Sequence, residues 1–265
     1  MPEDTLLDTG ERDLPAVVCL HSLFLDATFF DDFVEAGRGR FRFLRPTFPG
    51  QGGRTDEPTA TVTMDDCVKD VVSTLAAAGV GRYALIGQSM GGDVAVRIAA
   101  EHSESVTALV LIGSSARAEP PEQRAAFIGV VEQVEAAGFD AGLQTTVLEI
   151  MLGATTRADP DKQDLVQSYA RQIASLPAQL CHAVRGVVER EDASDLLGSI
   201  VAPTLVVNGT DDVARPPEWS ADVVSRIRGA RHVQLEGVGH SPTQEAPDVV
   251  LPLVLDFLAE HSPSN

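Results

Sequence analysis

The sequence has 265 residues, of which 44% are hydrophobic and 22% are charged, a composition that is ordinary for a folded globular protein. This length suits one α/β domain that carries an insertion better than two independent domains. The net charge of −19 argues against nucleic acids and anionic membranes as partners, because no basic stripe is present to neutralise phosphates.

Strand-like and helix-like segments alternate along the chain, which predicts a mostly parallel sheet with helices on both faces. The first strand is expected at 16–21, and the second at 41–48, where the sequence Pro-Gly-Gln-Gly-Gly forms a turn. The helix that follows is expected to begin at Thr63, which forms a capping-box pattern with Asp66, and to end at Gly79.

The alternation continues through a strand, a helix and an apolar strand, stops, and then resumes with two strands and a last helix. These elements are expected at 83–87, 90–101, 106–112, 204–207, 232–235 and about 247–260. In the interruption the apolar residues recur only at helical spacing. Helices inserted between two strands of a sheet are typical of a cap over one end of that sheet. We therefore predict a core domain of residues 1–116 and 191–265, and a helical cap of residues 117–190.

The clearest chemical signal is the sequence Gly-Gln-Ser-Met-Gly at 87–91, which matches the pattern G-x-S-x-G. The pentapeptide alone is weak evidence, but here it lies directly after an expected strand and directly before an expected helix. In that setting a sharp turn exposes a nucleophilic serine, and the glycines permit the turn. The pattern therefore indicates that Ser89 is a nucleophile.

A serine hydroxyl needs a base, and the base needs a carboxylate that orients it. Asp212 and His240 each follow an expected strand, and sites in parallel sheets form at the carboxyl ends of strands. Three unrelated folds use a triad of Ser, His and Asp, and in only one of them do the residues follow one another along the chain in the order Ser, Asp, His, as they do here. The sequence therefore predicts a catalytic triad of Ser89, Asp212 and His240, and we interpret the nearby His21 as a structural residue that orients its loop.

Taken together, these segments resemble the α/β-hydrolase superfamily over essentially the whole chain. Within it, the sequence His-Ser-Leu at 21–23 and the short cap resemble the branch of 3-oxoadipate enol-lactonases and simple esterases. The resemblance implies the α/β-hydrolase fold and an oxyanion hole made by the backbone N–H groups of Leu23 and Met90. It also implies that the triad carboxylate is the third residue after Gly209, which is Asp212 rather than Asp211.

The triad and the resemblance predict a serine hydrolase that cleaves a carboxylic ester or a lactone through an acyl-enzyme. A cofactor-free perhydrolase or haloperoxidase-like enzyme, a carbon–carbon bond hydrolase and a thioesterase would use the same triad, so these alternatives stay open. A non-catalytic ligand receptor on a hydrolase scaffold is a further alternative. No metal and no cofactor are expected, because the sequence has neither a His/Cys cluster with zinc spacing nor a dinucleotide-binding fingerprint.

The cap is expected to cover Ser89 and to form a largely apolar pocket for a hydrophobic ester or lactone. The bulky residues available to line this pocket are Phe127, Val131, Met151, Leu152 and Tyr169. A small dicarboxylate substrate would instead need a buried arginine that points inward from the cap. The candidates for that role are Arg117, Arg124, Arg171 and Arg185.

The remaining expectations concern the setting of the protein. Cys19, Cys67 and Cys181 lie in apolar segments, so we interpret them as buried small hydrophobic residues. Residues 1–8 contain three acidic residues and no basic one, unlike a secretory signal. No apolar run approaches the roughly 20 residues that span a bilayer, so we expect no contact with a membrane. We expect a cytoplasmic monomer or homodimer that binds a small molecule and no nucleic acid.

Overall fold

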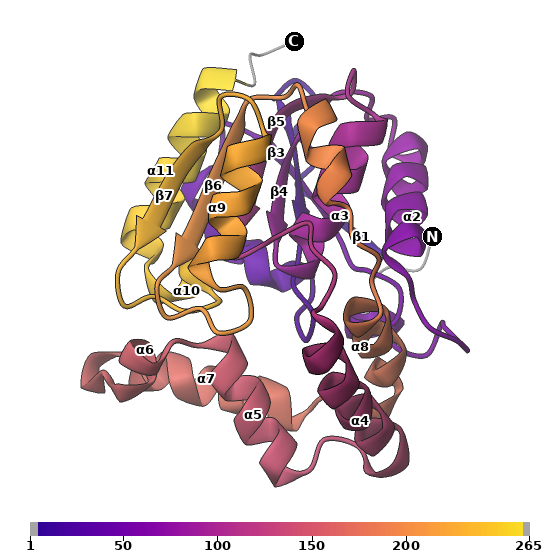
Figure 1. The fold of residues 1–265 in the computed structure, drawn as a ribbon. Coiled ribbons are helices and arrows are strands. Elements are labelled where there is room, and N and C mark those ends of the chain that lie inside the picture. The colour runs from indigo at the N-terminus through magenta and orange to yellow at the C-terminus, as the bar shows by residue number, and fades with distance from the viewer. Residues whose placement is uncertain (1–4, 262–265) are drawn as a thin grey trace.

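The computed structural model describes residues 5–261, so half of the N-terminal segment considered above lies outside the described residues. A seven-stranded sheet runs through the molecule in the order β1-β3-β2-β4-β5-β6-β7, as Figure 1 shows. Only β1 is antiparallel to its neighbour β3 within this sheet, and all other neighbours are parallel. The strands are β1 (Leu6–Asp8), β2 (Ala16–Leu20), β3 (Arg42–Pro46), β4 (Tyr83–Gln88), β5 (Val106–Ile112), β6 (Thr204–Gly209) and β7 (Arg231–Leu235).

The predicted fold class is confirmed, and each expected strand is present within a few residues of its expected bounds. The edge strand β1 was not predicted. It has three residues, which is too short for a periodic pattern to be recognised, and it is held by antiparallel pairing with β3. The capping box is also present: Asp66 N donates to Thr63 Oγ1, and Thr63 N donates to Asp66 Oδ2.

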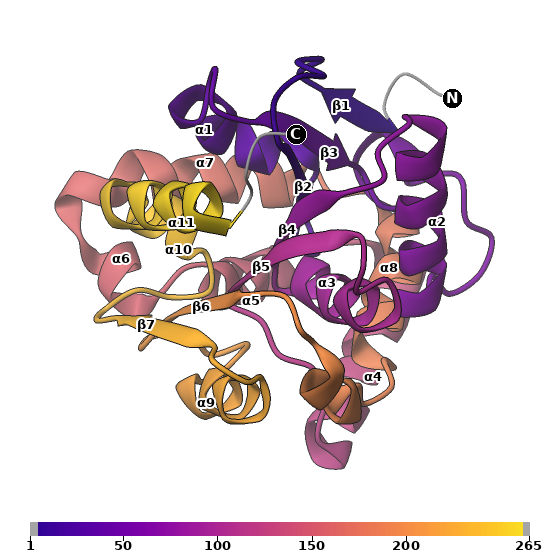
Figure 2. The same ribbon diagram turned by 90° about the horizontal axis from the view of Figure 1, so that it is seen from above.

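Helices cover both faces of the sheet, as Figure 2 shows from above. The strands between them are buried on both faces, which explains their almost continuous apolar sequences. Val17 and Val18 are neighbours in β2 and belong to the apolar clusters on opposite faces. One face packs against α2 (Met64–Ala77), α3 (Met90–Glu101) and α9 (Pro217–Arg226), and the other packs against α1 (Asp31–Ala36) and α11 (Pro247–His261).

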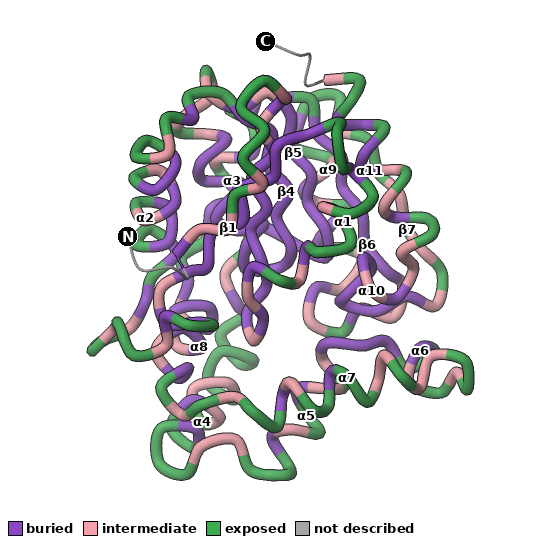
Figure 3. The backbone as a smooth tube through the Cα atoms, turned by 180° about the vertical axis from the view of Figure 1, so that it is seen from behind, coloured by how far each residue is buried: buried purple, intermediate pink, exposed green. Residues whose placement is uncertain are grey.

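A helical segment connects β5 to β6 and lies at the carboxyl end of the parallel strands (Figure 1). Its helices are α4 (Pro121–Ala137), α5 (Ala141–Met151), α6 (Ala154–Ala158), α7 (Gln163–Ala174) and α8 (Cys181–Val188). In Figure 3 the strands are largely buried, whereas α4 begins with a long exposed stretch. In the described part of the chain no helix is both long and apolar enough to cross a membrane.

The remaining elements are short. They are α10 (Pro242–Glu245) and the 3-10 helices η1 (Ala27–Phe30), η2 (Gly52–Arg54), η3 (Pro160–Lys162), η4 (Ala178–Leu180) and η5 (Ser194–Ser199). Among them, α10 matters most for the site, because it ends in Glu245, a buried residue next to the loop that carries His240.

The helical segment and the core are tied together by specific contacts. Thr155 in α6 donates from its backbone N and its hydroxyl to Asp211 Oδ2, at 3.1 and 2.6 Å. Glu245 Oε2 accepts from the backbone N of both Gly153 and Gly239, at 3.0 Å each. In α8, Gly186 lies so close to the core that an added Cβ would be 1.7 Å from the carbonyl oxygen of Val62.

Candidate active site

Ser89 lies on a sharp turn between β4 and α3. Its backbone has φ 50° and ψ −113°, in the left-handed half of φ that a residue with a side chain rarely adopts. The turn is held because Ser89 N donates to Ile112 O at 3.0 Å and Ser114 Oγ donates to Ser89 O at 2.9 Å. At Gly91 an added Cβ would lie 2.0 Å from Leu20 O, so the close approach of α3 to β2 requires glycine there.

The structure brings Ser89, His240 and Asp212 together, although they follow three different strands. His240 Nε2 lies 2.8 Å from Ser89 Oγ, and His240 Nδ1 lies 3.0 and 2.9 Å from the two carboxylate oxygens of Asp212. All three side chains are buried. An ionised carboxylate only accepts hydrogen bonds, so Nδ1 carries the proton and Nε2 accepts from the Ser89 hydroxyl.

Asp211 and Asp212 are adjacent, but their surroundings differ. Asp212 Oδ1 also accepts from the backbone N of Ala214 and Arg215, at 2.9 and 2.8 Å, which fixes the carboxylate below the imidazole. Asp211 is partly exposed and binds Thr155 instead, and the hydrogen bond from the Thr155 hydroxyl lowers the pKa of the Asp211 carboxyl. Only Asp212 therefore contacts His240.

Leu23 and Met90 lie where the expected oxyanion donors belong, in the loop after β2 and at the first residue of α3. Within residues 5–261, neither backbone N–H has a hydrogen-bond acceptor. The loop that carries Leu23 is held from both sides. Gln51 Oε1 accepts from Phe24 N at 3.1 Å, and Phe24 has φ 70°. Leu23 N–H is thus held by its loop and Met90 N–H by the start of α3, and both are left without an acceptor among the described residues.

His21 holds the same loop and takes no part in the triad. Its Nε2 accepts from Phe48 N at 3.1 Å, so its Nδ1 is the donor to Ser22 O at 2.8 Å. Burial lowers the pKa of His21 to about 4, so the imidazole is neutral near pH 7. This geometry agrees with the interpretation of His21 as a structural residue.

A cavity of about 260 Å³ lies above Ser89 and is lined by Ser89, His240 and Leu23 together with α4, α5 and α8. Most of its lining is apolar, as expected. Two of the five predicted pocket residues, Phe127 and Met151, line it.

The other three predicted pocket residues do not line this cavity. The lining face of α4 is formed by residues 123, 127, 130 and 134, whereas Val131 lies at the edge of that stripe and is fully buried in the apolar core. Leu152 follows the last residue of α5 in an extended conformation and is buried in the apolar cluster that also contains Ile173. The structure therefore places Val131 and Leu152 outside this cavity, and bulk alone did not indicate where their side chains point.

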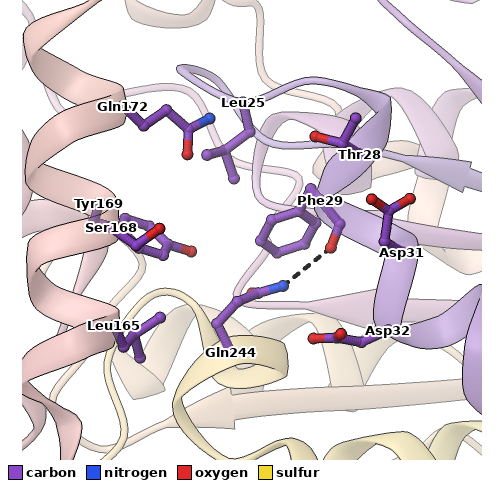
Figure 4. Close-up of a pocket in the computed structure, with 10 residues that line it drawn as sticks. All are labelled: Leu25, Thr28, Phe29, Asp31, Asp32, Leu165, Ser168, Tyr169, Gln172 and Gln244. Carbon is purple, nitrogen blue, oxygen red and sulfur yellow. Dashed lines mark hydrogen bonds between the residues drawn. The ribbon is translucent and has the colours of Figure 1, made fainter.

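Tyr169 lines a second cavity, which Figure 4 shows between α7, η1 and α10. This cavity has a volume of about 220 Å³ and is also lined by Leu25, Phe29 and Gln244, and Gln244 Nε2 donates to Phe29 O at 3.0 Å. Burial raises the pKa of the Tyr169 hydroxyl. None of Ser89, His240 and Asp212 lines this cavity, so the structure places Tyr169 away from the cavity above Ser89. Tyr169 packs instead in an apolar cluster with Val147 and Met151 of α5.

None of the arginines proposed for a substrate carboxylate lines the cavity above Ser89. Arg124 and Arg171 are exposed, and Arg185 pairs with Glu135 at 2.8 Å. The cavity is instead lined by Arg215 and Glu119, which were not predicted. No sequence pattern around Glu119 indicates that it lines the cavity. For Arg215, the only such signal is its position three residues after Asp212.

Glu119 and Arg215 belong to a buried charged cluster with Asp93 and Arg190. Glu119 Oε1 accepts from Arg190 Nη1 at 2.8 Å and from Arg215 Nη1 at 3.0 Å. Arg190 Nε and Arg215 Nη2 each lie 3.6 Å from Asp93 Oδ2. Burial raises the pKa of Asp93 and lowers that of Arg215. Because Glu119 precedes α4 and Arg190 follows α8, the cluster joins both ends of the helical segment beside Ser89.

The family model of the alpha/beta hydrolase family matches residues 17–253. The chain is 30% identical over 93% of its length to the polyketide synthase ThaQ of Burkholderia thailandensis, but it spans only 12% of that synthase. Among solved structures, a thermophilic esterase from Thermogutta terrifontis (malate bound) is 27% identical, with a TM-score of 0.87 and coverage of 97% of this chain and 93% of that one.

The enol-lactonase from Burkholderia xenovorans LB400 is 25% identical to this chain, with a TM-score of 0.86. The match covers 96% of this chain and 95% of the enol-lactonase. The family match extends from the second strand into the last helix and includes every residue of the site described above. The chain belongs to the alpha/beta hydrolase family.

Proposed function

We propose that this protein is a serine hydrolase that cleaves a carboxylic ester or a lactone through an acyl-enzyme on Ser89. The observation that carries the proposal is the continuous hydrogen-bond chain from Asp212 through His240 to Ser89, which ends at the cavity. The chain supplies a nucleophile, a base and an orienting carboxylate in contact with one another.

The first half of the reaction forms the acyl-enzyme. Ser89 Oγ attacks the carbonyl carbon while its proton moves to His240 Nε2, and the π pair of the carbonyl moves to the oxygen. The N–H groups of Leu23 and Met90 stabilise this oxyanion, an interaction in which each donor is worth roughly 3–4 kcal/mol of transition-state energy. The intermediate collapses, the ester C–O bond breaks, and His240 returns its proton to the leaving alkoxide.

The second half repeats this sequence with water as the nucleophile. His240 takes a proton from water, the resulting attack releases the acid, and Ser89 regains its proton. Asp212 stays ionised throughout and keeps the Nδ1 proton directed away from Ser89.

We assign residues 117–190 to a cap that shapes the pocket over the core formed by residues 1–116 and 191–265.

A hydrophobic ester or lactone is favoured over a small dicarboxylate. The lining of the cavity is mostly apolar, and Arg124, Arg171 and Arg185 are absent from it. The similarity to an esterase and an enol-lactonase supports chemistry at a carboxylic ester or lactone.

The proposal is tested with a panel of p-nitrophenyl esters and lactones of increasing size, together with labelling by a fluorophosphonate. The wild-type protein should hydrolyse members of the panel, and mass spectrometry should locate the label on Ser89. Ser89→Ala should lower kcat by several orders of magnitude, to a residual of roughly 10³–10⁴ over the reaction in water. Ser73→Ala, at an exposed serine of α2, is the matched control. Full activity of Ser89→Ala, or a receptor-like protein that binds esters without turnover, would contradict the proposal.

A further inference from the structure

The cavity above Ser89 has a polar end and an apolar end. Gln123, Phe127 and Val134 lie on the lining stripe of α4, so the cavity follows this helix. At 1.5 Å per residue, the stripe from Gln123 to Val134 covers about 16 Å. Glu119 and Arg215 line the polar end, near the start of α4, and Figure 1 shows α4 leading away from the sheet. Phe127, Val130 and Val134 follow along the lining stripe of α4 and are apolar.

Glu119 has one carboxylate oxygen in use and one free. Both arginine contacts go to Oε1, and no hydrogen-bond partner for Oε2 is present in the described part of the chain. The side chain is only 6% exposed. Glu119 lines the cavity, and Oε2 is not among the buried side-chain atoms that lack a partner, so this oxygen keeps access to the cavity. A ligand that covers Oε2 without supplying a donor leaves the carboxylate oxygen desolvated, and a ligand that supplies a donor avoids that cost.

Resting on the proposed function, we propose that Glu119 binds the substrate and accepts a hydrogen bond from its hydroxyl group at Oε2. The substrate class is then an otherwise apolar ester or lactone that carries a free hydroxyl. Its hydrocarbon part fills the region between α4, α5 and α8, and its hydroxyl reaches the polar end beside Glu119.

The charges around Glu119 favour a hydroxyl over an ionic group. A substrate carboxylate would approach Arg215 only in contact with the negative charge of Glu119. A substrate ammonium would compete with Arg190 and Arg215, which already bind the same carboxylate. A hydroxyl is neutral and has both a donor and acceptor lone pairs. It donates to Oε2, and its own oxygen is free to accept from Arg215 Nη2, which lies beyond hydrogen-bond distance of Asp93.

The test uses sets of esters that have the same carbon skeleton. Within a set, one position of the acyl chain or the alcohol carries hydrogen, hydroxyl or methoxy, and hydrolysis is followed by acid release. At one position the wild-type protein should prefer hydroxyl over both counterparts by at least about tenfold in kcat/KM, because only the hydroxyl satisfies the carboxylate. Absence of such a preference at every position, or a stronger preference for a carboxylate at that position, would overturn the proposal.

Glu119→Gln makes the test specific. If the amide oxygen stays with the two arginines, the amide N–H₂ faces the cavity, and hydroxyl and methoxy oxygens both accept from it. The preference for hydroxyl over methoxy should therefore fall close to one, whereas Glu122→Gln, at an exposed residue outside the cavity, should keep it. Because each ratio compares two substrates of one preparation, the folded fraction cancels. An unchanged ratio in Glu119→Gln would assign the preference to another residue.

The outcomes also separate the two proposals. If esters without a hydroxyl are hydrolysed through Ser89 but no hydroxyl isomer is preferred, only the role of Glu119 is wrong. If no ester is hydrolysed and Ser89 is not labelled, the hydrolase proposal itself is wrong. If Glu119→Gln does not fold, the absence of a hydroxyl preference in the wild-type protein still overturns the proposal.

Discussion

Two adjacent carboxylates, Asp211 and Asp212, differ in their contacts, and this difference makes a prediction for catalysis. Asp212→Asn removes the acceptor that keeps the Nδ1 proton of His240 in place, so kcat should fall by about 10⁴-fold, as expected when the wrong imidazole tautomer is favoured. Asp211→Asn weakens only the contact with Thr155 and should change kcat by less than about tenfold, because that pair is partly exposed. Steady-state kinetics on one p-nitrophenyl ester give both values, and the reverse ranking would assign the triad carboxylate to Asp211.

His21 predicts a loss of stability in acid. Its pKa is about 4 in the folded protein, against an ordinary value of 6.5, because the imidazole is buried. Below pH 6.5 the unfolded chain binds a proton at His21 that the folded protein does not. The free energy of unfolding therefore falls as the pH falls from about 6.5 to 4, by roughly 2–3 kcal/mol for this one group.

Urea unfolding at pH 7.0 and pH 4.5 measures this effect. His21→Gln should be less stable than the wild type at pH 7.0, because it loses the hydrogen bond with Phe48 N or Ser22 O. The difference in stability between the two pH values should nevertheless be smaller in His21→Gln, because the variant lacks the contribution of His21. It should not disappear, because the other titrating groups remain. An equal loss in both proteins would show that His21 is not the group responsible.

The triad was predictable from individual residues, whereas much of the pocket was not. Ser89 is marked by local glycines and by a strand and a helix on either side, and these signals persist in the fold. Val130 lines the cavity and Val131 does not, and that choice depends on how α4 is rotated against α8. Glu119 lines the cavity where both ends of the helical segment between β5 and β6 meet the core, and no local sequence pattern indicates such a contact.

At the scale of elements, α8 predicts the effect of two glycine substitutions. Gly186→Ala should destabilise the protein, because the added Cβ would lie 1.7 Å from the backbone oxygen of Val62 and the helix would have to move from the core. Gly129→Ala, at an exposed position in α4 where nothing lies within 4 Å, should stabilise it by up to about 1 kcal/mol, since alanine favours the helix. Thermal unfolding of the two variants gives the comparison, and equal stability would mean that α8 is not held tightly against the core.

Longer elements were predictable, and shorter or less periodic ones were not. α2 has a capping box, a stripe of apolar residues and a terminal glycine, so its bounds followed from the sequence to within a residue or two. α5 was not recognised as a separate helix, because its apolar residues face both the cavity and the cluster around Tyr169, which weakens the periodicity. Packing partners, rather than propensity, define such a helix.

At the scale of the whole molecule the charge is unbalanced, whereas the buried charged cluster beside Ser89 pairs two carboxylates with two guanidinium groups. Acidic residues outnumber basic ones by 39 to 20. Near Ser89, by contrast, the carboxylates of Asp93 and Glu119 lie beside the guanidinium groups of Arg190 and Arg215. The site thus gains no large attraction for anions from its own arginines, and the surface repels them. Both features favour a neutral substrate, in agreement with the apolar cavity.

The excess negative charge also predicts how stability depends on salt. Repulsion among surface carboxylates destabilises the compact chain, and raising the ionic strength from 10 to about 150 mM shortens the Debye length from roughly 30 to 8 Å, which screens that repulsion. The buried pairs around Glu119 are screened much less, so salt should weaken the surface repulsion more than these attractions. The Tm should therefore rise by a few degrees, since about 1 kcal/mol corresponds to roughly 2–4 °C for a chain of this size. Calorimetry in sodium chloride and in sodium sulfate at matched ionic strength checks this. Screening predicts the same rise in both salts, whereas a Tm that falls, or that follows the identity of the anion, would show that surface repulsion does not limit the stability of this protein.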